Sequence, residues 1–113
     1  MSDCLFCKIV AGDIPADKLY EDDDVFAFRD ISPQAPTHFL VIPKKHLSDL
    51  SAVNEDHEKL IGKLVRIGAE LAAQEGLDGG YRVIFNNGPD GGQIVYHIHM
   101  HILGGRQLSG PLG

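Results

Sequence analysis

The sequence His97-Ile98-His99-Met100-His101-Ile102-Leu103 alternates strictly between polar and apolar positions. Side chains along a β-strand point alternately to its two faces, so every second residue shares a face. This period predicts a strand over residues 94–103 with three imidazoles on one face, beside Val95 and Leu103. The opposite face is expected to be core and holds Tyr96, Ile98, Met100 and Ile102.

The segments that precede this strand predict a long helix and further strands. Apolar residues recur with the helical period between residues 54 and 75, after an acidic start and before Gly76. A strand is expected over 81–86, followed by a glycine-rich loop over 87–92. The apolar run within 37–43 lies between prolines and indicates a mostly buried strand.

The first thirty residues predict a short helix and a hairpin. Residues 3–11 favour a helix that ends near Gly12 and brings Cys4 and Cys7 onto one face. Residues 18–21 and 24–29 favour two strands joined at Asp22-Asp23. Short connections and a single long helix indicate an α+β fold with a five-stranded antiparallel sheet, one long helix and one short helix.

Length and composition limit the organisation and the partners. A chain of 113 residues supports one core, so we expect a single domain over 1–113, with its body over 3–106 and a tail over 107–113 whose last six residues are disordered. A net charge of −6 disfavours nucleic-acid binding. No apolar run is long enough to span a membrane and no secretory signal precedes the domain, so a cytoplasmic protein is expected.

The three alternating histidines predict chemistry rather than folding. One interpretation is a solvent-facing strand, and a second is a catalytic metal bound by histidines two positions apart. A third is phosphate chemistry, in which one imidazole attacks phosphorus and others bind its oxygens. The loop before them favours the third, because Gly88, Gly91 and Gly92 allow main-chain N–H groups to approach an anion and Gln93 adds an amide. His99, flanked on both sides, is the expected nucleophile.

The same residues resemble a known family. The segment 97–103 has the alternating signature of the histidine triad superfamily, and the segments 30–46 and 88–93 are similar to its Hint branch, the histidine triad nucleotide-binding proteins. The resemblance extends from about Asp3 to Arg106. It implies a homodimeric enzyme that hydrolyses the P–N bond of purine nucleoside phosphoramidates, such as AMP-linked amines, and also acts on aminoacyl-AMP.

The resemblance also implies a role for each histidine. His99 would form a covalent nucleotidyl intermediate that water later hydrolyses. His101 would contact the α-phosphate and help the amine depart, while the main-chain carbonyl of His97 would orient the nucleophile. His38 would extend the network from the facing strand. Phosphate oxygens would be held by Gln93 and by the main-chain amides after Gly91, at Gly92, Ile94 and Val95.

A nucleotide pocket follows from the same resemblance. Asp30 would accept hydrogen bonds from the ribose hydroxyls, and Asn86 would lie beside the base. Six apolar residues match the purine-binding positions: Leu5, Phe6, Ile9, Phe28, Ile31 and Leu40. Ordinary core packing is an equal explanation for Phe28, Ile31 and Leu40.

Two features depart from the Hint pattern. Ile94 replaces a serine that many members carry there, which removes a hydroxyl donor near the phosphate. The tail lacks the tryptophan-containing ending of familiar animal members, so substrate preference does not transfer. Two other functions stay open: hydrolysis of dinucleoside polyphosphates, and a nucleotide-binding regulatory or scaffold role with incidental catalysis.

The two cysteines have several explanations. A thiol pair or half of a metal site fits their spacing better than a disulfide framework does, and a redox pair lacks the usual βαβ context. By resemblance to zinc-binding members of the superfamily, Cys4, Cys7, His46 and His97 would hold a structural zinc. Two partly buried thiols without metal are the alternative. Catalysis on histidine itself requires no cofactor.

Overall fold

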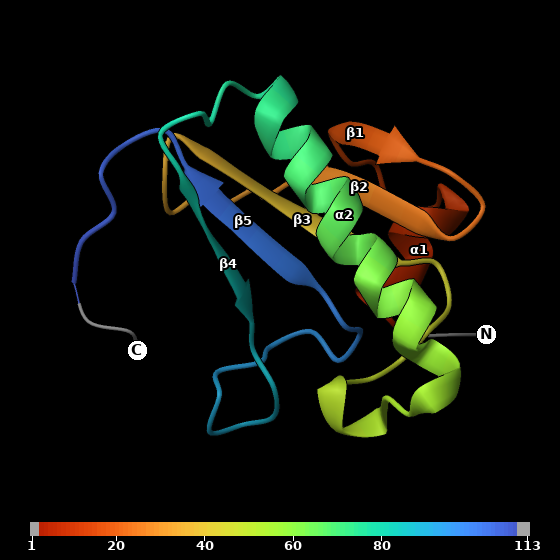
Figure 1. Cartoon of the computed structure of the whole chain (residues 1–113). Helices are drawn as coiled ribbons and strands as arrows, with labels where there is room; N and C mark the ends of the chain where they lie inside the picture. Colours follow the sequence, from red (N-terminus) through yellow and green to blue (C-terminus); the bar gives the residue numbers. More distant parts are fainter. Residues whose placement is uncertain (1–2, 111–113) are drawn as a thin grey trace.

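The computed structural model describes residues 3–110 and contains a five-stranded antiparallel sheet with helices on both faces (Figure 1). The strands lie in the order β1-β2-β3-β5-β4. The elements along the chain are α1 (Leu5–Ala11), β1 (Lys18–Glu21), β2 (Val25–Arg29), β3 (Thr37–Pro43), two short 3-10 turns (Leu50–Ala52 and Glu55–His57), α2 (Glu58–Gln74), β4 (Tyr81–Phe85) and β5 (Met100–Gly104). The predicted α+β class and antiparallel sheet are confirmed.

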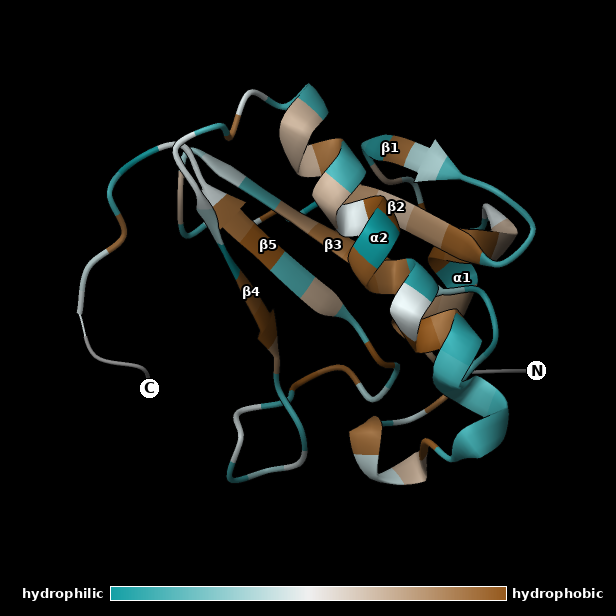
Figure 2. Cartoon of the chain, in the orientation of Figure 1, coloured by the Kyte–Doolittle hydropathy of each residue, from teal (hydrophilic) through white to brown (hydrophobic). Residues whose placement is uncertain are grey.

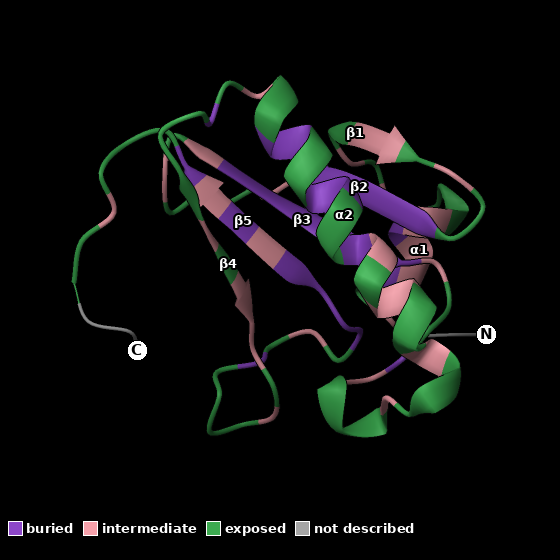
Figure 3. Ribbon diagram, viewed as in Figure 1, coloured by how far each residue is buried: buried purple, intermediate pink, exposed green. Residues whose placement is uncertain are grey.

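Each face of the sheet has its own apolar cluster. On one face, Phe39 and Val41 of β3 pack with Leu64 and Ile67 of α2. On the other face, Leu40 and Ile42 of the same strand pack with Phe6 and Ile9 of α1. Figure 3 shows the resulting band of buried residues through β2 and β3. Strand alternation in β3 therefore supplies both clusters.

Helix α2 crosses the sheet, and hydrophilic and hydrophobic segments alternate along it (Figure 2). Leu64, Ile67 and Leu71 of the helix are buried, whereas its exposed side holds Arg66 and Glu70 together with Val65. Asn54 caps the preceding turn, because its side-chain oxygen accepts from the N–H of Asp56 at 2.9 Å. Gly68 allows the close approach to β5: a Cβ there would lie 2.4 Å from Cε of Met100. The predicted helix over 54–75 thus exists, with its first turn in 3-10 form. Among residues 3–110, no helix has the length and apolar character needed to span a bilayer.

Helix α1 ends where its sequence predicts and begins two residues later than predicted, at Leu5. The sulfur of Cys4 accepts from the N–H of Cys7 at 3.4 Å at the helix N-terminus. Gly12 ends the helix with φ 86°, a left-handed conformation that glycine adopts without strain. The helix has only seven residues, so its stability depends on packing and on contacts at its ends.

The last strand is shorter than predicted. The pairing of Met100 with Val41 would continue to place Ile98 opposite Pro43. Proline has no N–H to donate and ends β3, so the ladder stops there. Ile98 instead donates its N–H to the carbonyl of Leu47 at 2.8 Å. Residues 94–99 are therefore outside the sheet, and the predicted strand over 94–103 is wrong in its first half.

The predicted alternation of buried and exposed side chains along residues 96–102 is confirmed in part. Ile98, Met100 and Ile102 are buried in the cluster under α2, as predicted. Tyr96 was placed on the same face, but it is 42% exposed because its segment bends before the strand begins. At the chain end, residues 107–110 form neither helix nor strand, and the rest of the predicted tail, 111–113, lies outside the described residues.

Candidate active site and metal centre

A cavity of about 450 Å³ opens between α1, the end of β2 and the segment that precedes β5. Its size suits a small organic ligand. Most of the residues predicted for a nucleotide pocket line it: Leu5, Phe6, Ile9, Phe28, Asp30, Ile31, Leu40, Asn86, Gly92, Ile94 and Val95. His99 and His101 line it too.

The apolar walls belong to two groups. Phe6, Phe28 and Leu40 are buried members of the cluster under α1, so they serve core and cavity together. Ile31 is 96% exposed and Ile94 is 89% exposed, and both line the cavity from its rim. Core packing therefore does not explain Ile31. The lining also includes Ile14, Pro15, Ala16, Arg29 and Ser32, which the sequence did not single out as site residues.

His99 presents a lone pair to the cavity. Its Nδ1 lies 2.8 Å from the carbonyl oxygen of His97. A carbonyl only accepts, so Nδ1 carries the proton and Nε2 is free to act as a nucleophile. Phe6 packs edge-on against the ring at 5.1 Å between centroids. Burial lowers the pKa of His99, which favours the neutral ring.

His101 and His38 form a hydrogen-bonded pair of imidazole rings. Nδ1 of His101 lies 2.9 Å from Nε2 of His38, which is also 3.4 Å from Oδ2 of Asp30. Burial lowers the pKa of His38, and burial together with the neighbouring histidines lowers the pKa of His101 to about 4. Both rings are therefore neutral near pH 7. These two histidines come from adjacent strands, because Leu40 of β3 pairs with His101 of β5.

The glycine-rich loop is built differently from the prediction. Gln93 is buried, and its side-chain NH₂ donates to the carbonyls of Ser48 at 2.8 Å and Val95 at 3.1 Å. The side-chain Oε1 of Gln93 accepts from the main-chain N–H of Gly88. The main-chain N–H of Gln93 donates to the carbonyl of Gly88. These contacts use the side-chain amide of Gln93 to close the loop, and its binding of phosphate stays a prediction.

Two of the loop glycines also serve the loop itself. The N–H of Gly92 donates to the carbonyl of Pro89 at 3.1 Å. At Gly91 a Cβ would lie 2.4 Å from the carbonyl oxygen of Asn87, so only glycine allows this close turn. The N–H groups of Gly88 and Gly92 are thus used within the loop, and phosphate binding by the loop amides stays a prediction. The pocket-lining residues that follow it are Ile94 and Val95.

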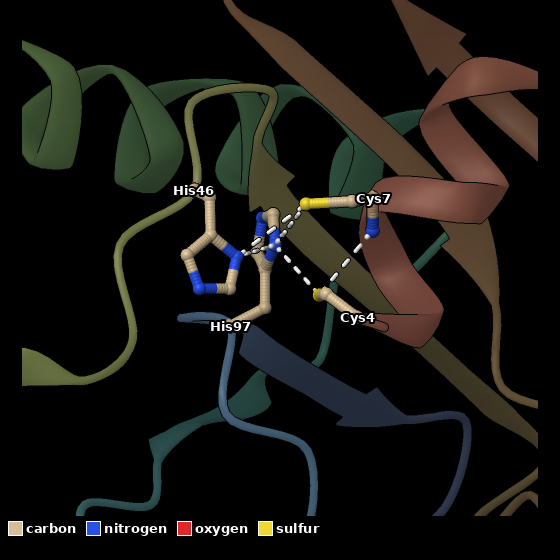
Figure 4. Close-up of side chains that lie close together, drawn as sticks. All are labelled: Cys4, Cys7, His46 and His97. Carbon is tan, nitrogen blue, oxygen red and sulfur yellow. Dashed lines mark hydrogen bonds between the residues drawn. The ribbon is translucent and has the colours of Figure 1, made fainter. Parts of the chain in front are cut away.

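Cys4, Cys7, His46 and His97 converge at the N-terminus of α1 (Figure 4). Their ligand atoms all lie within 4.8 Å of one another. Nδ1 of His97 is 3.3 Å from Sγ of Cys4 and 3.6 Å from Sγ of Cys7, and Nδ1 of His46 is 3.4 Å from Sγ of Cys7. The four predicted ligands are thus brought together, from α1 and from the segments after β3 and before β5.

The tautomer of His97 fits a metal ligand. Its Nε2 lies 2.7 Å from the carbonyl oxygen of Pro43, so Nε2 carries the proton and Nδ1 turns its lone pair to the cysteines. Two sulfurs and two nitrogens are the donor set that zinc takes in closed tetrahedral sites. His97 links this centre to the cavity, because its carbonyl holds His99.

Comparisons with known proteins agree with this geometry. Residues 11–108 match the family described as HIT domain. The chain is 51% identical over 109 residues to the purine nucleoside phosphoramidase of Escherichia coli strain K12, covering 96% of this chain and 91% of that protein. It is 51% identical over 114 residues to the 14 kDa zinc-binding protein of Zea mays, covering 99% and 89%.

Solved structures give the same result. A HIT family hydrolase from Legionella pneumophila superposes with a TM-score of 0.96 at 53% identity, covering 98% of this chain and all of that one. A histidine triad protein from Clostridium difficile superposes with a TM-score of 0.94 at 44% identity, covering 99% and 98%. Sequence, cavity and fold lead to one conclusion: the chain belongs to the HIT domain family.

Proposed function

We propose that this HIT-family hydrolase cleaves the P–N bond of purine nucleoside 5′-phosphoramidates, of which AMP-linked amines are the substrate class. We propose that it also hydrolyses the P–O bond between the aminoacyl group and AMP in aminoacyl-AMP. The observation that carries the proposal is the free Nε2 of His99, fixed by the carbonyl of His97 and facing an apolar cavity. The 51% identity to a purine nucleoside phosphoramidase supports the same reaction.

The reaction has two steps. Nε2 of His99 attacks the α-phosphorus, an Nε2–P bond forms, and the P–N bond to the amine breaks with its electron pair leaving on nitrogen, which takes up a proton. His99 then holds the nucleotidyl group as an imidazolium, and the carbonyl of His97 stabilises the Nδ1–H. Water next attacks phosphorus and releases one proton to the solvent, the Nε2–P bond breaks, and AMP leaves with the ring neutral and still protonated at Nδ1.

The cavity is proposed to bind the nucleoside half of the substrate. Phe28, Leu40 and Ile9 would contact the purine, with Asn86 beside it. The carboxylate of Asp30, which already accepts from the N–H of Ser32 at 2.8 Å, would accept from the ribose hydroxyls through its remaining lone pairs. Nε2 of His101 and the main-chain amides of Ile94 and Val95 would bind the phosphate oxygens.

The Cys4, Cys7, His46 and His97 centre is proposed to hold a structural zinc. A zinc ion bound there supplies a closed tetrahedral anchor and no open coordination position for catalysis. The name of the Zea mays relative supports a metal in this family. We further propose a homodimer that works in the cytoplasm on a small-molecule nucleotide.

The test compares the rates at which the protein hydrolyses two kinds of substrate. Both rates are measured on wild-type protein and on Asp30→Asn, which lacks the carboxylate proposed to bind the ribose. Adenosine 5′-phosphoramidate should release AMP and ammonia faster than a diadenosine polyphosphate is cleaved. Faster cleavage of the polyphosphate would show that the protein is a dinucleoside polyphosphate hydrolase instead. Binding of AMP without turnover of either substrate would instead support a regulatory binding module.

A further inference from the structure

One nitrogen of the catalytic cavity has no hydrogen-bond partner. Nε2 of His101 is buried and unpaired among residues 3–110, although it lines the cavity. A buried polar atom left without a partner has lost its contact with water and gained none in exchange, so a ligand that pairs with it is favoured. Whether this nitrogen donates or accepts depends on which ring nitrogen carries the proton.

The main-chain N–H of Gln34 settles that question. It donates to Nδ1 of His38 across 3.1 Å. Because a peptide N–H only donates, Nδ1 of His38 has no proton and the neutral ring carries its proton on Nε2. That proton is donated to Nδ1 of His101 at 2.9 Å. His101 therefore carries its own proton on Nε2.

We infer that the main-chain N–H of Gln34 is a positioning group of the active site, which acts through His38 to make Nε2–H of His101 a fixed hydrogen-bond donor. This inference rests on the proposed function for what His101 meets, namely a phosphate oxygen. The acting group belongs to the main chain, since the side chain of Gln34 is exposed and donates to the carbonyl of Ser32 at 3.0 Å.

The chain of donors also limits what His101 can do. If Nε2 of His101 released its proton to the amine, His38 would have to refill the ring through Nδ1 of His101. His38 would then need a proton at Nδ1, and the peptide N–H of Gln34 cannot supply one. A proton that Nε2 of His101 gives to the amine is therefore replaced from solvent, and not through His38 and Gln34.

The same contact argues against a second metal centre. Ligand atoms of Asp30, His38 and His101 lie within 4.8 Å of one another. A metal on Nε2 of His38 would need a lone pair there, and the proton would move to Nδ1. Nδ1–H would then face the N–H of Gln34, and two donors would oppose each other. The cluster is consequently a hydrogen-bond chain.

Two measurements test the inference separately from the proposed function. Long-range ¹H–¹⁵N NMR of the free protein reports which imidazole nitrogen is protonated, with assignments from His38→Gln and His101→Gln. The expected spectrum shows Nε2–H for both rings. A proton on Nδ1 of either ring would overturn the inference, whatever the protein hydrolyses.

The second measurement replaces the peptide bond before residue 34 by an ester, which removes only the N–H. Gln34→Ala keeps the N–H, so its spectrum should match wild type, whereas the ester should move the His38 proton to Nδ1. Relative to Gln34→Ala, the ester should lower kcat by about 10-fold or more. This is less than the roughly 100- to 1,000-fold for losing a donor that contacts the reacting atoms, because Gln34 acts through two rings. Unchanged tautomers in the folded ester protein would contradict the assignment to Gln34. Correct tautomers without phosphoramidate turnover would overturn only the proposed function.

Discussion

Three histidines in or beside the cavity, His38, His97 and His99, each contact a main-chain group that can act only as donor or only as acceptor. The carbonyls of His97 and Pro43 hold protons on His99 and His97, and the N–H of Gln34 keeps one off Nδ1 of His38. The ring tautomers thus follow from main-chain contacts. Side-chain patterns do not encode these contacts, so the sequence indicated the histidines and not their protons.

Burial of neutral imidazoles makes stability depend on pH. The pKa of His101 is about 4 in the folded protein and about 6.5 in an unfolded chain, so the unfolded state binds more protons between these values. Stability is complete above pH 6.5 and falls as pH drops toward 4. We expect the loss of Tm between pH 7 and 5 to be about 4–8 °C smaller in His101→Asn, measured on chelator-treated protein. Equal losses in the two proteins would show that His101 is not held neutral.

The carboxylate of Asp30 should accept hydrogen bonds from the ribose hydroxyls of the substrate. Replacing it with Asn removes a charged acceptor, and we expect kcat/KM for an adenosine phosphoramidate to fall about 10- to 100-fold. The 2′-deoxy substrate should show a much smaller fall, because the partner hydroxyl is already missing. Steady-state kinetics of the two proteins on the two substrates form the double cycle. Equal falls on both substrates would place Asp30 away from the ribose.

Among the elements, α1 has two tasks. It carries Cys4 and Cys7 toward His97, and it supplies Leu5, Phe6 and Ile9 to the cavity wall. A seven-residue helix has little stability of its own, so metal at one end should hold the wall in place.

Removal of the metal should therefore weaken nucleotide binding. Cys7→Ser should lose bound zinc and raise the Kd for AMP by roughly 10-fold, which corresponds to losing part of one apolar wall. Lys8→Ser, in the same helix, should keep both properties. Metal content and calorimetric titration with AMP provide the measurements. Loss of zinc with an unchanged Kd for AMP would show that α1 keeps its place in the cavity wall without the metal.

Elements whose signals are local were predictable. The period of α2, the prolines around β3 and the glycine after α1 lie within their own segments, and their boundaries agree within a few residues. The start of β5 was missed because Pro43 of the partner strand sets it. The role of Gln93 was missed for a similar reason, since its amide bonds the carbonyl of Ser48, far away in the sequence. The four metal ligands lie together, as the family resemblance implied. The spacing of Cys4 and Cys7 pairs only those two residues and does not indicate that His46 and His97 join them.

At the scale of the whole molecule, one edge of the sheet and the adjoining helix expose apolar side chains. β4 is the edge strand, with Tyr81 and Val83 exposed, and Val65 is exposed on α2. Unpaired edge strands with apolar side chains favour association. This surface is where we place the proposed dimer contact.

Charge on that edge should produce monomers. Val83 is 45% exposed, so Val83→Lys should fold while placing an ammonium group against the partner's β4. Sedimentation velocity should then show a monomer at concentrations where wild type is a dimer. Ala11→Lys, at the exposed end of α1, is the control and should remain dimeric. A Val83→Lys protein that stays dimeric would place the interface elsewhere.

The most direct test of the whole account is intact-mass spectrometry of chelator-treated protein, quenched rapidly during turnover of adenosine 5′-phosphoramidate. Wild type should carry one added adenylyl group, and His99→Ala, shown to be folded by circular dichroism, should carry none. Steady release of AMP by wild type without any adduct, or a His99→Ala protein that still acquires the group, would contradict nucleophilic catalysis by His99.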